Sequence, residues 1–129
     1  MNPQQAAQIH PEESLRICLL GGFRILQGEA SFGAERFRLR RACDLIKLLA
    51  LAPRRRLQRD QLLEWLWPDH DPALSANSLQ QALRPARQVL GALVPPCYLR
   101  FEDESLCLHS EPPPWVDVEA FEAAAAQAR

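Results

Sequence analysis

The sequence predicts an α+β domain in which a group of helices is flanked on both sides by short strands. Apolar residues alternate with other residues over 15–26, which is typical of a strand. The apolar spacing changes to steps of three and four over residues 39–52, which indicates an amphipathic helix. Strand character returns at residues 97–109, and a trailing helix follows.

The N-terminal strands are broken by glycines. Gly21 and Gly22 interrupt the first apolar run and mark a bulge or a turn, because they lack the lysine and the GxxxxGK frame of a phosphate loop. A turn at 27–29 separates this run from a further short strand within 30–37, where Phe32 is expected to point inward.

Two helices are predicted in the middle of the chain. The first covers 39–52 and ends at Pro53, which cannot continue it. The second covers 60–67, with Asp60 as its N-cap and Pro68 as its stop. The residues of the second helix that we expect at the core are Leu62, Leu63 and Leu66, with Trp65 and Trp67 as core and core-edge residues.

A third helix is expected after a loop at 69–74, with Ser75 or Asn77 as its cap. The apolar spacing continues in phase across Pro85, so we expect one kinked helix rather than two. Gly91, followed by two prolines, ends it. Its apolar stripe consists of Leu79, Leu83, Ala86, Leu90 and Leu93.

A β-hairpin is predicted from 97–101 and 106–109, joined by a tight turn at 102–105. A triple proline then forms a stiff linker, and Asp117 is expected to cap an Ala-rich helix that reaches the last residue. This helix holds too few large apolar residues to build a domain, so we expect the chain to be a piece of a longer protein.

Composition places the chain among ordinary globular proteins. It has 129 residues, of which 47% are hydrophobic and 24% charged, which is the size and make-up of one domain. No apolar run approaches the roughly 18 residues of a membrane span, and the N-terminus lacks the features of a signal peptide. Four scattered cysteines show no disulfide or zinc spacing. We therefore expect a cytoplasmic protein without membrane contact.

No catalytic or metal-binding constellation is visible. The three histidines have no nucleophile or carboxylate at a suggestive spacing, so no enzyme activity and no cofactor are expected. Asp69, His70 and Asp71 form a compact group, but they have no distant third partner for a metal ion. Loop or helix-capping chemistry is the expected role of this group.

The net charge of −1 conceals two blocks of opposite sign. Seven acids and no Lys or Arg occur over residues 101–122, whereas nine basic residues and a single acid occur over 36–59. A basic surface attracts nucleic acid, although a solvated helix face in an arginine-rich protein is the other interpretation. The basic residues are Arg36, Arg38, Arg40, Arg41, Lys47, Arg54, Arg55, Arg56 and Arg59.

Helices of about eight and about seventeen residues followed by a hairpin make a winged helix-turn-helix, in which the third helix enters the major groove of DNA. Four segments then resemble one family in the same order: LRICLLGGFRI, LIKLLALAPRRRLQRDQLLEWLWPDHDP, ANSLQQALRPARQVLGAL and WVDVEAFEAA. They are similar to the N-terminal region of bacterial activators of the Streptomyces antibiotic regulatory protein (SARP) type, which share the OmpR/PhoB-type winged-helix domain.

This resemblance implies an N-terminal antiparallel sheet on three helices, a C-terminal hairpin wing, and sequence-specific binding to double-stranded DNA with contact to RNA polymerase. It also implies that the last helix opens a helical-repeat bacterial transcriptional activation domain. The chain is thus divided into a flexible tail at 1–14, a DNA-binding domain at 15–110, and a linker with the first helix of a truncated domain at 111–129.

The side chains of the third helix that we expect to contact DNA are amides, hydroxyls and guanidiniums. Asn and Gln pair with adenine and Arg with guanine, although a polar solvated face has the same composition. The recognition candidates are Asn77, Ser78, Gln80, Gln81, Arg84, Arg87 and Gln88. The phosphate candidates are Arg38, Arg40, Arg41, Arg54, Arg55, Arg56, Arg59 and Ser75.

Three features depart from the family pattern. Pro85 replaces the first arginine of an Arg-Leu-Arg sequence, and it also lies inside the helix. The wing tip carries Glu102, Asp103 and Glu104, which phosphates would repel. The alternative function is therefore a winged helix used for protein contact, as a homodimer or through docking on another domain, including autoinhibition.

Overall fold

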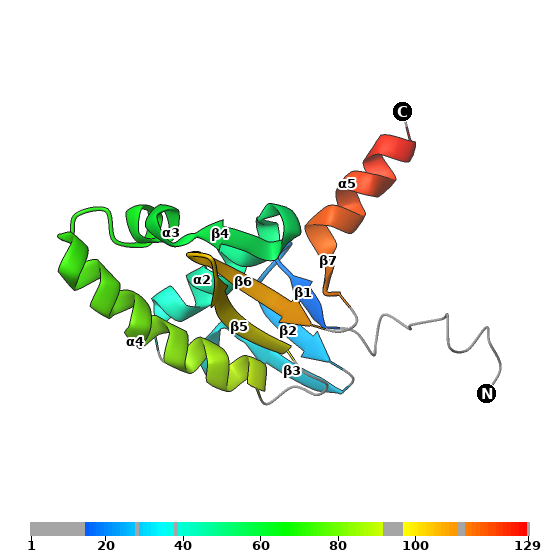
Figure 1. The fold of residues 1–129 in the computed structure, drawn as a ribbon. Coiled ribbons are helices and arrows are strands. Elements are labelled where there is room, and N and C mark those ends of the chain that lie inside the picture. The colour runs from blue at the N-terminus through cyan, green and yellow to red at the C-terminus, as the bar shows by residue number, and fades with distance from the viewer. Residues whose placement is uncertain (1–14, 28, 38, 92–96, 111–112, 129) are drawn as a thin grey trace.

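The computed structural model describes residues 15–27, 29–37, 39–91, 97–110 and 113–128. Within them the chain forms four α-helices and two sheets, with a β-hairpin towards the C-terminal side (Figure 1). The predicted α+β class is therefore confirmed. The predicted tail at 1–14 lies outside the described residues.

The first sheet has the strand order β3-β2-β1-β7. β1 (Arg16–Cys18), β2 (Arg24–Gln27) and β3 (Ala30–Gly33) pair in antiparallel fashion, as predicted. β3 is the short strand expected within residues 30–37, and a 3₁₀ turn, η1 (Ala34–Arg36), follows it. Gly21 and Gly22, between β1 and β2, have φ angles of 78° and 148°. Residues with a side chain rarely adopt this backbone conformation, so the turn favours glycine.

The fourth strand of this sheet, β7 (Trp115–Val116), was not predicted. It pairs in parallel with β1, where Ile17 lies opposite Val116. The end of the expected proline-rich linker is thus part of the sheet. A two-residue strand that pairs with a segment almost a hundred residues away leaves no local pattern in the sequence.

The middle of the chain follows the prediction with one addition. α2 (Arg40–Leu51) ends before Pro53, which begins the 3₁₀ turn η2 (Pro53–Arg55). A short strand, β4 (Arg56–Gln58), then precedes α3 (Arg59–Leu66). The predicted cap at Asp60 is wrong, because Gln58 occupies the N-cap and Asp60 lies in the first turn, where its charge favours the helix dipole.

α4 (Pro72–Gly91) begins earlier than predicted. The carboxylate of Asp71 accepts a hydrogen bond from the backbone N–H of Leu74 at 2.9 Å, so Asp71 caps the helix. The predicted cap at Ser75 or Asn77 is therefore wrong, and so is the loop expected through residue 74. α4 continues through Pro85 as one helix, as predicted, while its kink stays a prediction.

The second sheet has the strand order β4-β6-β5. β5 (Cys97–Glu102) and β6 (Ser105–Ser110) form the predicted hairpin. Its two turn residues, Asp103 and Glu104, have φ angles of 48° and 63°, as a tight turn that matches the strand twist requires.

The core lies around α2, which packs against α3, α4 and β6. The predicted inward residues of α3 and α4 are buried, except that Leu63 is half-buried and Leu93 lies outside the described residues. Trp67 packs on the core, whereas Trp65 is 49% exposed, so its predicted place in the core is wrong. Phe32 packs against the core while partly buried, as expected.

α5 (Asp117–Gln127) projects away from the rest of the domain in Figure 1 and has no buried residue. The predicted cap at Asp117 is wrong, because Val116 occupies the N-cap. The Asp117 carboxylate instead accepts hydrogen bonds from the backbone N–H groups of Leu19 and Leu20 at 2.9–3.0 Å. Among the described residues, no helix combines the length and apolar character that a membrane crossing needs.

Candidate nucleic-acid interface

The face of α4 opposite the core carries the seven polar side chains selected from the sequence. All are exposed except Ser78, which is half-buried. Because the buried residues of this helix recur at steps of three and four, the polar ones share the opposite face. We call this set the α4 polar face: Asn77, Ser78, Gln80, Gln81, Arg84, Arg87 and Gln88.

The first turn of α2 lies beside the α4 polar face. Arg40 and Arg41 line a shallow hollow of about 180 Å³ together with Ser78 and Gln81. Arg41 also forms an ion pair with Asp44 at 3.0 Å, whereas Arg40 has no ion pair among the described residues. Two predicted phosphate candidates and two predicted recognition residues therefore share one surface.

Two arginines of the α4 polar face differ in how they are held. The Nε of Arg87 donates a hydrogen bond to the carbonyl oxygen of Leu99 in β5 at 3.1 Å. Arg84 lies one turn earlier, is exposed, and has no hydrogen bond or ion pair within the described part of the chain. Arg87 thus ties the helix to the hairpin, while Arg84 presents its full guanidinium to solvent.

The phosphate candidates at residues 54–59 do not join this surface. They lie on η2, β4 and the start of α3, beside the hairpin and α5. Arg54 is exposed, and Arg59 shares a hollow with Asp60, Asp103 and Glu104. Arg59 forms no ion pair with these carboxylates among the described residues.

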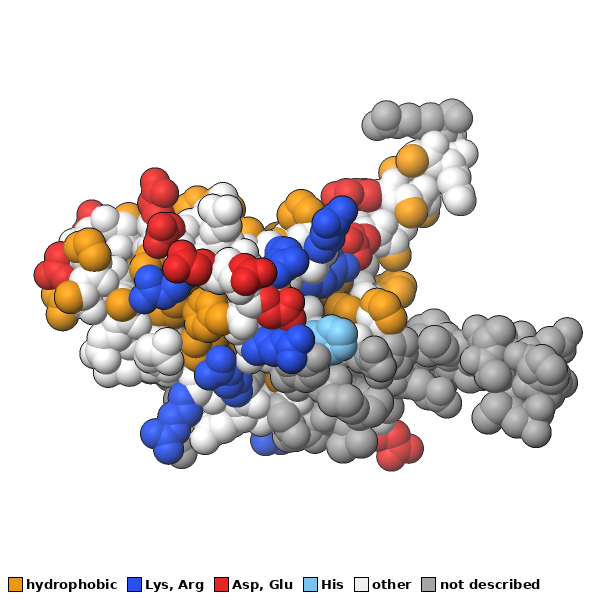
Figure 2. All heavy atoms as spheres, viewed as in Figure 1, with side chains coloured by type: hydrophobic (Ala, Val, Ile, Leu, Met, Phe, Trp, Pro, Cys, Tyr) orange, Lys and Arg blue, Asp and Glu red, His pale blue; other side chains and the backbone are white. Residues whose placement is uncertain are grey.

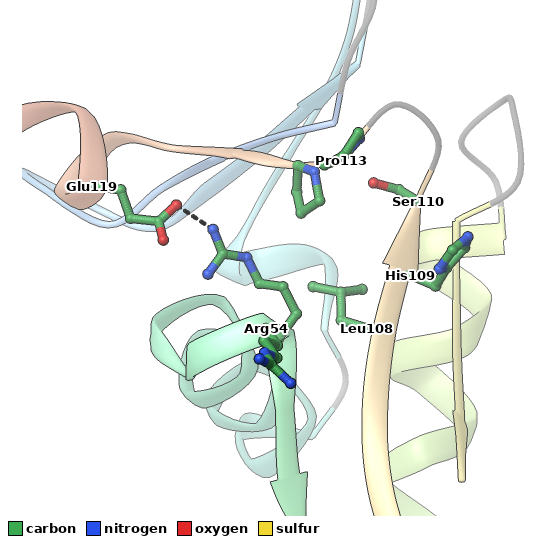
Figure 3. Close-up of a pocket in the computed structure, with 8 residues that line it drawn as sticks. Arg54, Leu108, His109, Ser110, Pro113 and Glu119 are labelled. Atoms are coloured by element: carbon green, nitrogen blue, oxygen red, sulfur yellow. Dashed lines mark hydrogen bonds and ion pairs between the residues drawn. The ribbon is translucent and has the colours of Figure 1, made fainter. Parts of the chain in front are cut away.

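Arg55 is committed within the protein. Its side chain is only 14% exposed, it forms an ion pair with Glu119 of α5, and it donates to the carbonyl of Ala52 at 3.3 Å. Arg55 and Glu119 both line a pocket of about 370 Å³, together with Arg54, His109 and Ser110. Figure 3 shows this pocket, with the labelled Glu119 on the side of α5. Arg55 is therefore less available to phosphate than the exposed arginines, and its contact with phosphate stays a prediction.

Two other phosphate candidates are not placed on this surface. Ser75 is buried, and its hydroxyl donates to the carbonyl of Asp71 at 2.9 Å, so its predicted phosphate role stays a prediction that its burial does not favour. Arg38 lies outside the described residues.

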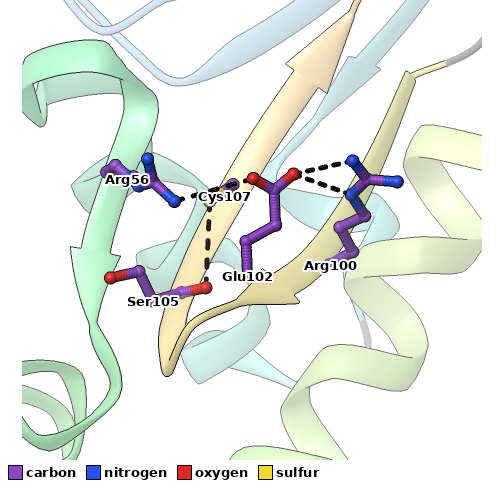
Figure 4. A network of polar contacts seen from close by, with 5 residues as sticks. All are labelled: Arg56, Arg100, Glu102, Ser105 and Cys107. Carbon is purple, nitrogen blue, oxygen red and sulfur yellow. Dashed lines mark hydrogen bonds and ion pairs between the residues drawn. The ribbon is translucent and has the colours of Figure 1, made fainter.

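The hairpin tip is less acidic than its sequence suggests. The Glu102 carboxylate accepts from Arg100 at 2.8 Å and lies 3.6 Å from the guanidinium of Arg56 (Figure 4). The hydrogen bond and the charge of Arg100, with a smaller contribution from Arg56, lower the pKa of Glu102. Two of the three tip carboxylates, those of Asp103 and Glu104, remain exposed.

The tip also does not extend beyond the sheet. The last paired row joins Gln58 of β4, Ser105 of β6 and Glu102 of β5, and the turn follows at once. The backbone N–H of Arg59 donates to the carbonyl of Glu104 at 2.9 Å, which holds the turn against the start of α3. A hairpin this short has no free arm to reach along a groove.

Part of this surface could have been read from the sequence. Arg100 and Glu102 are two residues apart on one strand, so they share a face and their pairing follows from strand geometry. The third partner, Arg56, reaches Glu102 only through the pairing of β4 with β6, which sequence reasoning missed.

The Asp69–Asp71 group and the cysteines are the other residues whose chemistry the sequence singled out. The predicted capping role of the Asp69–Asp71 group is confirmed at Asp71, and the described residues contain no cluster of three or more His, Cys, Asp or Glu that could hold a metal ion. Burial raises the pKa of the Cys18 and Cys43 thiols, which makes both poor nucleophiles.

Comparisons with known protein families, curated proteins and solved structures gave no match for this chain.

Proposed function

We propose that this domain binds duplex DNA in a sequence-specific manner as a winged helix-turn-helix, with α4 in the major groove. The observation that carries the proposal is the exposed row of amides and guanidiniums on α4 beside Arg40 and Arg41. The order α2, β4, α3, α4 and the β5-β6 hairpin also supports it, since helix-turn-helix domains with a wing use this order.

The roles of the side chains follow from their chemistry. Asn77, Gln80 and Gln81 present amides suited to adenine, and Arg84 presents a fork suited to guanine. Arg40 and Arg41 contact the phosphates that flank the groove. Because Arg87 is tied to β5, base reading is concentrated in the half of α4 before Pro85.

The resemblance to SARP-type activators extends this proposal to the biological role. The domain is then the N-terminal reader of a bacterial transcription regulator that acts in the cytoplasm and contacts RNA polymerase. In the same proposal α5 begins a helical-repeat domain.

The experiment is selection of a binding site from random duplexes, followed by fluorescence anisotropy titration at several salt concentrations. If about four to six phosphates are neutralised, log K falls against log salt with a slope of about −4 to −5. Binding that prefers the selected duplex over a scrambled one supports the proposal. No binding to any duplex at low salt would contradict it.

The alternative is a winged helix used for protein contact. The ring of Phe121 on α5 is 65% accessible, which makes it the side chain at which this alternative is tested. Sedimentation over a concentration series distinguishes the two functions: self-association that Phe121→Ser abolishes, together with absent DNA binding, favours this alternative.

A further inference from the structure

The outer face of the β4-β6-β5 sheet carries its own arginines. Leu57, Leu106 and Leu108 point into the core, so the alternate residues of these strands point outward. One outward row consists of Arg56, Cys107 and Arg100, which lie opposite one another on the three strands. Two guanidiniums thus flank the middle of the sheet on the same face.

The carboxylate of Glu102 lies between these guanidiniums. Glu102 belongs to the next outward row and contacts Arg100 at 2.8 Å and Arg56 at 3.6 Å (Figure 4). All three side chains are partly accessible, with exposures of 40% for Glu102, 42% for Arg56 and 59% for Arg100. The group is therefore an ion-pair bridge at the surface and not a buried network.

This bridge adjoins the α4 polar face. Arg87 of α4 donates to the carbonyl of Leu99, the residue before Arg100, so guanidiniums from the helix and the sheet lie close together. Figure 2 shows basic side chains spread over this side of the molecule, with acidic ones among them over the hairpin. Basic and acidic side chains thus mix on this face, and Glu102 is the acid that lies between the guanidiniums of Arg56 and Arg100.

We infer that Glu102 competes with DNA phosphates for Arg56 and Arg100, so that the sheet face is a second phosphate-contact surface held closed by one carboxylate. This inference rests on the proposed function, because it names how the same DNA complex is regulated. A backbone phosphate offers two anionic oxygens that a planar guanidinium fork can bind in bidentate fashion, so it can replace the carboxylate of Glu102 at these arginines.

The exchange needs little energy because the bridge is exposed. Ion pairs at accessible positions contribute little to stability and are screened by salt. The lowered pKa of Glu102 keeps the carboxylate ionised throughout the neutral range, so a fall towards mildly acidic pH does not open the bridge. Only a competing anion opens it, which suits a surface that responds to the approach of a polyanion.

The test compares Glu102→Gln with Glu104→Gln. Both variants remove one carboxylate from the hairpin, but Glu104 has no ion pair among the described residues. We expect Glu102→Gln to bind the selected duplex about three- to tenfold more tightly, with a salt slope steeper by about one to two, since each neutralised phosphate adds about 0.9. Glu104→Gln, which changes net charge alone, is expected to change affinity less than twofold and to leave the slope unchanged.

A third variant tests where the gain comes from. Glu102→Gln combined with Arg56→Gln and Arg100→Gln is expected to lose the whole gain on both the selected and a scrambled duplex. Equal effects of Glu102→Gln and Glu104→Gln would overturn the inference, as would a gain that survives removal of both arginines. Circular dichroism melts establish that each variant is folded at the titration temperature.

Titrations of the wild-type domain and of Glu102→Gln distinguish a failure of this inference from a failure of the proposed function. If the wild-type domain binds DNA and Glu102→Gln adds nothing, the inference is wrong and the proposed function stands. If the wild-type domain binds no duplex, the proposed function is wrong and the inference, which depends on it, falls with it.

Discussion

Two groups of arginines in this domain have the same chemistry but different surroundings. At the junction of α2 and α4, Arg40 and Arg84 are exposed and have no ion pair within the described residues. At the η2–β4 segment, Arg55 faces Glu119 and Arg56 faces Glu102. Two arginines of the denser basic run, Arg55 and Arg56, therefore already have carboxylate partners within the protein.

This difference shows that charge counted along a chain is not charge available to a partner. The acidic block of the sequence supplies the partners of the basic block, because the hairpin and α5 fold back onto η2 and β4. What remains for DNA is the smaller group of arginines near α4. The following measurements test that contrast.

The largest effect is expected for Arg84. Arg84→Ala should cost about 1–3 kcal/mol on the selected duplex and relax the preference at one base position, because a bidentate contact to guanine is lost. Arg40→Gln is the matched comparison: it should weaken binding uniformly across sequences and make the salt slope shallower by about 0.9. Titrations on single-substitution duplexes separate the two patterns, and a uniform loss for Arg84→Ala would identify it as a phosphate contact instead.

A smaller effect on stability is expected at the committed arginine. Glu119→Gln removes the partner of the mostly buried Arg55 guanidinium and should destabilise the fold by about 1 kcal/mol, because Glu119 itself is half-exposed and screened. Urea unfolding measures the change. Glu122→Gln on the same helix has no such partner among the described residues, so an equal loss there would refute the assigned role of Glu119.

A gain in stability of about 0.5–1 kcal/mol is expected for Arg54→Gly. Arg54 has φ 58°, a left-handed conformation that costs a side-chain-bearing residue energy and that glycine adopts freely. Arg55 has nearly the same angle, 56°, but Arg55→Gly should destabilise because it removes the ion pair with Glu119. Thermal melts of the two variants should therefore shift in opposite directions.

The smallest effect concerns pH. The folded-state pKa of Glu102 is lowered by Arg100 and Arg56, so the bridge contributes stability above the carboxyl's unfolded pKa, and this contribution is lost as the pH falls through the folded value. Titration of the Glu102 carboxyl by NMR should show a low midpoint, and Arg100→Gln should raise that midpoint. An unchanged midpoint in the variant would mean that Arg100 does not hold this carboxylate.

The parts of the fold that local patterns determine could be predicted, and the parts set by distant pairing could not. Apolar residues spaced three and four positions apart predicted α2, α3 and α4. The short polar segment between two strand-like runs predicted the hairpin that turns at Asp103 and Glu104. Two short strands, β4 and β7, depend on partners elsewhere in the chain. The prediction that Asp117 caps its own helix failed for the same reason, since its carboxylate binds the backbone amides of Leu19 and Leu20 instead.

The candidate site likewise contains a part that local spacing predicts and a part that depends on tertiary contacts. The α4 polar face follows from helical spacing, and the residues expected on it are exposed or half-buried. Arg55 and Ser75 are less accessible than their residue types suggest, because burial and partners decide whether a polar side chain reaches solvent.

The attachment of α5 gives that helix a mechanical part in the domain. The Asp117 carboxylate accepts a hydrogen bond from the backbone of Leu19, which follows β1 and lies 98 residues earlier in the sequence. Glu119 forms an ion pair with Arg55 of η2, which lies 64 residues earlier. A force applied to the exposed end of α5 therefore arrives at two anchors, one at the rim of the first sheet and one at the turn that leads into β4. A partner that binds α5 would therefore hold a helix whose first turn is tied to both of these places.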